Sequence, residues 1–332
     1  MTGNGKGDRA AIEIRDLRVD YGDFVAVSDI SLNVPFGEVY GLVGPNGAGK
    51  TSTFKVLATL MEPTYGEVVL AGIDALENKE EARCIIGYMP DLAPVPSDLK
   101  AWEFLDFYAD AYALGSSRQR SERVDECLDI VSLGNERQSW CNQLSRGQTQ
   151  RLVLAKTLLH RPKVMILDEP ASGLDPLSRR ELRHSLQAIA REGASILVSS
   201  HILSELAEMC SSLCVMNQGK ILAAGTAAEV RRDLGRSERK IAIVVLDRRE
   251  DTVSWLEKQE GVEEVGAKEG DGHKIAVRFA GDDTQQAALL SGLVQQEISV
   301  KTFEETSASF EEILVEIAED NRQPGEGVTR GS

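Results

Sequence analysis

The sequence predicts an α/β protein with a mostly parallel sheet, followed by a smaller α+β domain. Short apolar strands alternate with helical segments over residues 1–231, and a glycine-rich loop joins one such strand to a helix. Toward the C-terminus, strands and helices follow one another in the order βαββαβ, the ferredoxin-like split arrangement. The length of 332 residues suits two domains, at about 100–200 residues each.

The strands and helices of the first domain begin with a strand over residues 12–21. Its side chains alternate between apolar and polar, with a slip in the alternation after Ile14. The segment VYGLVG is a short apolar strand, and a helix that begins at Thr51 follows it. The segments EVVLAGID and IIGYMP predict two more strands of the same sheet.

Helical signals dominate the middle of this domain. An aromatic stripe at helical spacing runs from Trp102 to Tyr112, and we interpret it as core. We therefore expect helices over residues 98–135. Two buried strands follow, KVMILDEP and ASILVSSH, and each ends in polar residues. Because both strands belong to the predicted parallel sheet, these polar ends should meet at one edge.

A polar and charged segment, residues 232–239, is predicted to link the two domains. In the second domain, residues 240–319, the strands are KIAIVVL, VEEVGAK, HKIAVRF and ISVKTF. DTVSWLEKQ and TQQAALLSGLVQQ are the helices between them, and a last helix is expected over about residues 307–319. The tail, residues 320–332, is polar and is expected to be disordered.

The composition disfavours several classes of function. The chain has 37 Lys and Arg against 53 Asp and Glu, a formal net charge of −16, whereas nucleic acid phosphates are bound by clustered cations. We therefore expect no nucleic acid partner. No apolar run approaches the ~18 residues of a membrane helix, and the first residues lack the apolar core of a signal peptide. We expect a cytoplasmic chain that does not cross a membrane.

The segment GPNGAGKT matches the phosphate-binding loop pattern G-x-x-x-x-G-K-[ST], and it lies between a strand and a helix as that pattern requires. Its glycines let backbone N–H groups converge on phosphates at the N-terminus of the helix. Lys50 is expected to reach the β- and γ-phosphates of ATP, and the Thr51 hydroxyl to ligate Mg²⁺. The predicted nucleotide-binding residues here are Gly44, Pro45, Asn46, Gly47, Ala48, Gly49, Lys50, Thr51 and Ser52.

Two carboxylates, Asp168 and Glu169, follow the apolar strand VMIL. Buried carboxylates are costly unless they meet a cation or water. Asp168 is predicted to bind Mg²⁺ through water, and Glu169 to act as the general base for the attacking water. His201 ends the next strand, where a contact to the γ-phosphate and a purely structural role are both open.

The motifs GPNGAGKT, LSRGQTQR, ILDEP, SGLD and SSH occur in this order, and together they resemble the ATPase subunit of an ATP-binding cassette (ABC) transporter. The resemblance covers roughly residues 12–231. It implies a P-loop NTPase (RecA-like) ABC nucleotide-binding domain with a helical subdomain over about residues 95–157. In this family LSRGQ is the signature motif, which closes over ATP held by a second cassette in a homo- or heterodimer. Ser145, Gly147 and Gln148 would contact that ATP.

The same resemblance assigns roles to three further residues. Tyr21 matches the aromatic residue that stacks on adenine, although a role in the strand core stays open. Asp175, in SGLD, matches the loop that couples the two ATP sites. Asp91 stands where the family usually has Gln, or Glu in some exporters, and it would bind Mg²⁺ or water with a shorter side chain. Arg146 stands in the signature where a second Gly is common.

The segment after Asp91 and the C-terminal TFEETSASFEEILVEIAED resemble exporter-type subunits that work with drug, lipid or polysaccharide permeases. The resemblance implies an ATPase on the cytoplasmic face of the membrane that drives a separate permease through a groove near residues 88–110. Two alternatives stay open: an importer ATPase with a regulatory C-terminal domain, and a soluble ABC protein acting on ribosomes or nucleic acid. The acidic charge disfavours the last of these.

Overall fold

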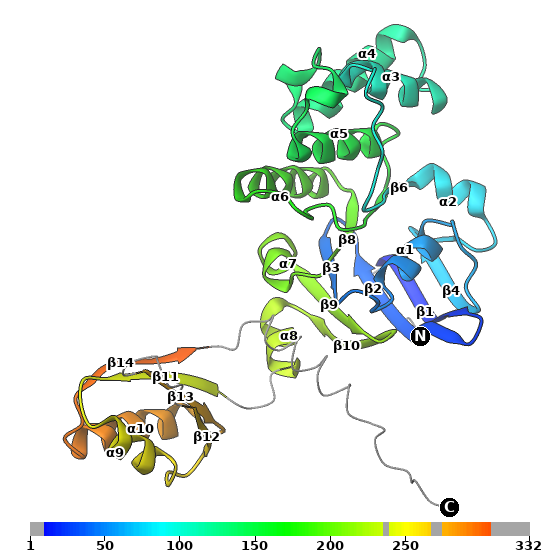
Figure 1. Cartoon of the computed structure of the whole chain (residues 1–332). Helices are drawn as coiled ribbons and strands as arrows, with labels where there is room; N and C mark the ends of the chain where they lie inside the picture. Colours follow the sequence, from blue (N-terminus) through cyan, green and yellow to red (C-terminus); the bar gives the residue numbers. More distant parts are fainter. Residues whose placement is uncertain (1–9, 235–238, 267–273, 307–332) are drawn as a thin grey trace, which may run out of the picture. The chain divides into compact units, whose positions relative to one another are not determined.

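The computed structural model describes residues 10–234, 239–266 and 274–306. The chain separates into two units, Met1–Val230 and Arg231–Ser332, and each contains its own sheet structure (Figure 1). The predicted last helix over residues 307–319 and the predicted disordered tail, residues 320–332, lie outside the described residues.

The first unit is built on a six-stranded sheet in the order β10-β9-β3-β8-β7-β6. The pairs from β9 to β6 are parallel, and β10 is antiparallel to β9. The strands are β3 (Val39–Val43), β6 (Ile86–Met89), β7 (Val164–Leu167), β8 (Ser195–Ser200), β9 (Ser212–Asn217) and β10 (Lys220–Gly225). Every residue of β3, β7 and β8 is buried, as expected of strands covered on both faces. The prediction of a mostly parallel sheet is confirmed.

An antiparallel sheet in the order β2-β1-β4-β5 packs against this core. Its strands are β1 (Ala10–Tyr21), β2 (Phe24–Pro35), β4 (Tyr65–Leu70) and β5 (Ile73–Asp74). The slip that the sequence showed after Ile14 is a register shift between Ile14 and Leu17, and Asp16 within it has a φ of 48°. Helix α1 (Lys50–Leu57) contributes the fully buried Phe54 to the core that both sheets share.

Helices α6 and α7 pack against β3 and β8. Helices α3, α4 and α5 pack against one another, and α5 also contacts α6 and β6 (Figure 1). The helical elements of this unit are α2 (Lys79–Ile85), α3 (Ala101–Ala111), α4 (Ser117–Ile130), η1 (Gly134–Glu136), η2 (Cys141–Gln143), α5 (Arg146–Leu158), α6 (Pro176–Arg191) and α7 (Leu203–Met209). Helix α8 (Ala227–Leu234) includes the boundary between the two units. The predicted stripe is core only in part. Leu105, which lies within it, is fully buried, whereas Trp102 and Tyr108 are half-buried and Tyr112 is 43% exposed. Among the described residues, no helix combines the length and apolar character needed to cross a membrane.

The second unit has an antiparallel sheet in the order β12-β13-β11-β14. Its elements are β11 (Arg239–Val245), α9 (Arg249–Leu256), β12 (Val262–Gly266), β13 (Lys274–Phe279), α10 (Asp283–Gln295) and β14 (Val300–Thr306). Ile243, Val277 and Phe279 of the sheet form one core with Leu256 and Leu293 of the helices. The ferredoxin-like assignment stays a prediction, and this strand order supports it. Helix α8 runs to Leu234 and β11 begins at Arg239, and the predicted linker over residues 232–239 stays a prediction.

Candidate functional site

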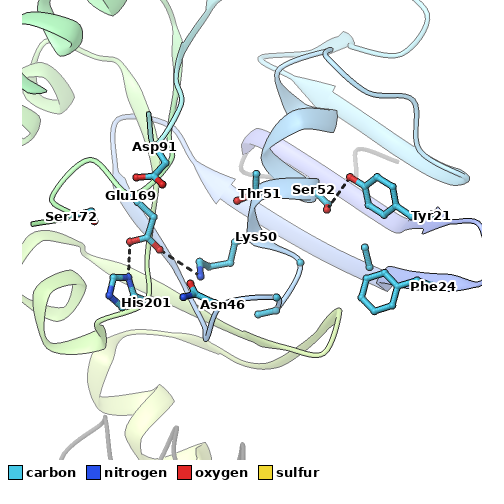
Figure 2. A pocket seen from close by; sticks show the side chains of 14 residues that line it. Tyr21, Phe24, Asn46, Lys50, Thr51, Ser52, Asp91, Glu169, Ser172 and His201 are labelled. Carbon is cyan, nitrogen blue, oxygen red and sulfur yellow. Dashed lines mark hydrogen bonds and ion pairs between the residues drawn. The ribbon is translucent and has the colours of Figure 1, made fainter. Parts of the chain in front are cut away.

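A cleft of about 360 Å³ opens in the first unit, beside the junction of β3 and α1 (Figure 2). Its walls come from the turn between β1 and β2, the glycine-rich loop, and the segments that follow β6, β7 and β8. The lining residues are Tyr21, Phe24, Ala26, Asn46, Gly47, Ala48, Gly49, Lys50, Thr51, Ser52, Asp91, Glu169, Ser172 and His201. The fold therefore brings into one cleft most of the residues that the sequence predicted from separate motifs.

The glycine-rich loop has a backbone that depends on Gly49. This residue has a φ of 105°, and a Cβ atom there would lie 2.5 Å from the carbonyl oxygen of Ala26. Gly49 is also the N-cap residue of α1, so no side chain accepts a hydrogen bond from the N–H groups of the first turn. That turn also has no acidic residue. The N–H groups of this turn are thus available for an anion, in the place where the sequence predicts phosphates.

Lys50 is 6% exposed and is held inside the loop. Its Nζ donates to the carbonyl oxygens of Gly44, at 2.6 Å, and Pro45, at 3.3 Å. The same Nζ lies 3.6 Å from Oε1 of Glu169. Burial lowers the pKa of Lys50, and the carboxylates of Glu169 and Asp168 oppose that effect. The ammonium is consequently held at the loop, beside the Glu169 carboxylate. When a nucleotide binds, a phosphate oxygen could take the place of this carboxylate as the partner of Lys50.

Asp168 is 2% exposed and bonds two hydroxyl groups. Ser199 Oγ donates to Oδ1 at 2.6 Å, and Thr51 Oγ1 donates to Oδ2 at 3.0 Å. Among the described residues, no group of three or more His, Cys, Asp or Glu side chains could hold a metal by itself. Mg²⁺ is usually bound by one or two carboxylates together with substrate phosphates and water. The pair of Thr51 and Asp168 fits a Mg²⁺ that arrives with a nucleotide.

Glu169 lies between a cation and an imidazole (Figure 2). Its backbone has a φ of 50°, and its N–H donates to Ser199 Oγ at 2.9 Å. Oε2 lies 2.8 Å from Nδ1 of His201, while Oε1 faces Lys50. The unusual φ turns this side chain into the cleft whereas Asp168, the preceding residue, stays buried. Sequence reasoning missed Ser199, which bonds to both acidic residues, because it resembles a core residue of an apolar strand.

Asp91 follows β6 and lines the same end of the cleft. Partial burial raises the pKa of Asp91, and so do the carboxylates of Asp168 and Glu169. Arg146 and His201 lower it. Asp91 therefore lies within electrostatic reach of the predicted Mg²⁺ position, and its role as a ligand of Mg²⁺ or water stays a prediction.

Two aromatic rings lie at the end of the cleft opposite His201 (Figure 2). Tyr21 is 47% exposed, so a role in the strand core is wrong. Its hydroxyl lies 3.3 Å from Ser52 Oγ and donates to Met61 Sδ at 3.4 Å. Phe24 is 62% exposed and was not identified from the sequence, although it follows Tyr21 across a short turn that contains Gly22. Exposed rings at this position suit the stacking of a planar base.

Comparison with known proteins identifies the family. A family model described as ABC transporter matches residues 27–172, and one described as ATP-binding protein DrrA1-3-like, C-terminal domain, matches residues 225–318. The chain is 32% identical over 275 residues to the bacitracin transport ATP-binding protein BcrA of Bacillus licheniformis, covering 81% of this chain and 89% of BcrA. The chain belongs to the family of ABC transporter ATP-binding proteins.

Other members of the ABC family differ in how much of their length matches. The Nod factor export ATP-binding protein I of Cupriavidus metallidurans is 34% identical over 221 residues, which are 67% of this chain and 73% of that protein. The probable multidrug ABC transporter ATP-binding protein YbhF of Escherichia coli is 33% identical over 71% of this chain, and the match spans only 41% of YbhF. A solved dimeric bacterial ABC transporter cassette, 25% identical, aligns with a TM-score of 0.59 over 65% of this chain and 98% of its own.

The signature of this ABC cassette lies outside its own cleft. Ser145 caps α5: its Oγ accepts from the N–H of Gln148 at 3.2 Å, and Gln148 Oε1 accepts from the N–H of Ser145 at 2.8 Å. Gly147 is buried next to the side chain of Ser178. Asp175 caps α6 and accepts from Ser178 Oγ at 2.6 Å. None of the predicted Ser145, Gly147, Gln148 and Asp175 lines the described cleft, and their contact with ATP on a second cassette stays a prediction.

Proposed function

We propose that this chain binds ATP with Mg²⁺ in the described cleft and hydrolyses it to power a membrane permease that is a separate chain. The position of Glu169 carries the proposal. It lies between Lys50 and His201, directly beside a complete phosphate-binding loop. A carboxylate placed next to the γ-phosphate position is suited to activate water.

The proposed chemistry is an attack of water on the γ-phosphorus, in line with the bond to the β-phosphate oxygen that breaks. Glu169 takes the proton of the attacking water. Lys50 and the N–H groups at the start of α1 hold the phosphates, and Thr51 and Asp168 would hold Mg²⁺, which neutralises phosphate charge. His201 holds the Glu169 carboxylate in place and lines the same cleft, where we propose that it contacts the γ-phosphate.

A second cassette, identical or different, is part of the proposal. Ser145, Gly147 and Gln148 of the signature do not line the chain's own cleft, and we propose that they contact ATP held by another copy. The solved dimeric cassette with the same fold supports this arrangement. In the proposed cycle, ATP joins the two cassettes and hydrolysis allows them to separate.

Export through a permease is supported by the relatives, which include proteins named for multidrug transport and Nod factor export. We place the chain on the cytoplasmic face of the membrane. The test is to tag a Glu169→Gln variant, solubilise native membranes in detergent and identify what co-purifies in ATP with Mg²⁺. We expect a polytopic membrane protein. Recovery of ribosomes, or of soluble proteins alone, would contradict a role in transport.

The two aromatic residues of the cleft give a prediction on nucleotide affinity. Tyr21→Ala and Phe24→Ala should each weaken ATP binding about 2–10-fold, because stacking of aromatic rings contributes about 0.5–1.5 kcal/mol. Equilibrium titration with ATP measures this, and Phe107→Ala, which removes an exposed ring outside the cleft, is the control. Unchanged affinity in both cleft variants would contradict adenine stacking at this end.

A further inference from the structure

An ion pair joins α6 to α7 close to the predicted catalytic residues. Arg179 Nη2 lies 2.9 Å from Oε1 of Glu205. The side chain of Glu205 is 5% exposed and that of Arg179 is 35% exposed. Burial raises the pKa of Glu205, and Arg179 and Ser200 counter that effect. A buried carboxylate is strongly destabilising without its partner, so this pair fixes the two helices at one place.

Each member of the pair also binds a loop of the nucleotide site. Arg179 Nη2 donates to the carbonyl oxygen of Leu174, at 3.2 Å, within the SGLD loop that precedes α6. Ser200 Oγ donates to Oε2 of Glu205 at 3.3 Å and accepts from the N–H of Ile202 at 3.0 Å. A continuous set of contacts therefore runs from the SGLD loop to the two residues that flank His201.

His201 depends on these flanking contacts for its position. Its side chain is 44% exposed, whereas its partner Glu169 is 13% exposed. Little packing surrounds the imidazole, so the backbone of Ser200 and Ile202 largely determines where the ring lies relative to Glu169. Glu205 fixes that backbone through the Ser200 hydroxyl.

A second ion pair on the same helices serves as a comparison. Arg183 Nη1 lies 2.8 Å from Oε2 of Glu208, about one helical turn farther along α6 and α7. Glu208 is 69% exposed and Arg183 is 27% exposed. This pair joins α6 and α7 just as the first does, but it lies at the solvent-exposed surface.

We propose that Arg179 and Glu205 are positioning residues that hold the SGLD loop and His201 in fixed positions relative to each other. When a second cassette displaces the loop, the contact between His201 and Glu169 therefore changes. The inference rests on the proposed function, in which a second cassette approaches the SGLD loop. The pair acts through His201 and does not itself touch ATP.

The test replaces both partners together, in Arg179→Leu/Glu205→Leu, so that no buried charge loses its partner. Phosphate release by the full chain should show kcat lowered about 10–100-fold, because a small displacement of catalytic groups has effects of this size. KM for ATP should stay within about twofold, because the contacts that bind the phosphates are unchanged. The matched control, Arg183→Leu/Glu208→Leu, should keep both constants. Equal kcat values in the two double variants would overturn the proposal.

A second readout does not depend on turnover. The chain has four histidines, and the NMR signal of the His201 ring can be assigned from a His201→Gln variant. We expect that signal to shift in Arg179→Leu/Glu205→Leu and to stay in place in the control; an unmoved signal would overturn the proposal. Absence of turnover in the native chain would instead contradict the proposed function. If the double variant does not fold, Glu205→Gln, which removes the charge of Glu205, is measured instead. We expect the His201 ring signal to shift in this variant too, and an unmoved signal would overturn the proposal.

Discussion

Replacing Lys50 with Ala should abolish turnover and weaken ATP binding about 10–150-fold. The expectation follows from the buried position of its ammonium, which two carbonyl oxygens of the loop hold within 3.3 Å. In this setting the charge is desolvated, and a charged hydrogen bond to phosphate contributes about 1.5–3 kcal/mol or more. Loss of the side chain also removes the cation that faces Glu169.

The measurements for Lys50→Ala are equilibrium titration with ATP and phosphate release. Lys55→Ala, in the last turn of the same helix, is the control and should behave as the native chain. Thermal unfolding of both variants shows whether the loop still folds, because Lys50 also bonds Gly44 and Pro45. Turnover of Lys50→Ala at the native rate would refute the assignment of the ATP site.

Much of the site could be predicted because its residues sit at the ends of parallel strands. β3, β8 and β7 are neighbours in that order, so the residues that follow them meet at one edge of the sheet. The sequence shows the strands and the polar residues after them, and from this Lys50, Asp168 and His201 could be placed together. The order of the strands does not follow from the sequence pattern and required the structure.

Other parts of the site could not be predicted because their meaning depends on distant contacts. Ser199 lies within a strand that is buried throughout, where a serine ordinarily bonds the backbone. Its hydroxyl instead bonds Asp168 and Glu169, which directly follow the neighbouring strand β7. Arg179 and Glu205 are on different helices, and helical periodicity assigns no partner to either. Strand β2 was not predicted, although its sequence carries a strand signal. Ile30, Leu32 and Val34 stand at every second position, and all three are buried.

Replacing Glu169 with Gln should leave ATP binding intact and slow hydrolysis by about 100–10,000-fold, the usual contribution of a general base. Gln keeps the size of the side chain and can still bond His201, but it cannot take a proton from water. If the signature of a second cassette completes the site, ATP that is bound but not hydrolysed should hold two chains together. Size-exclusion chromatography with ATP and Mg²⁺ should then show a dimer that native protein forms only transiently.

A matched control shows whether Glu169 acts as the general base or only stabilises the structure. It compares ATP hydrolysis by Glu169→Gln with hydrolysis by a variant of a second acidic residue. Glu208→Gln changes a mostly exposed acid on α7 and should hydrolyse ATP normally, without a lasting dimer. A Glu169→Gln protein that hydrolyses ATP at the native rate would exclude Glu169 as the base. If Glu169→Gln retains ATP but stays monomeric, the assignment of Glu169 as the base stands and the nucleotide-joined dimer is excluded. The signature would then contribute nothing to holding ATP. The two results separate the chemistry of the cleft from the assembly that the signature implies.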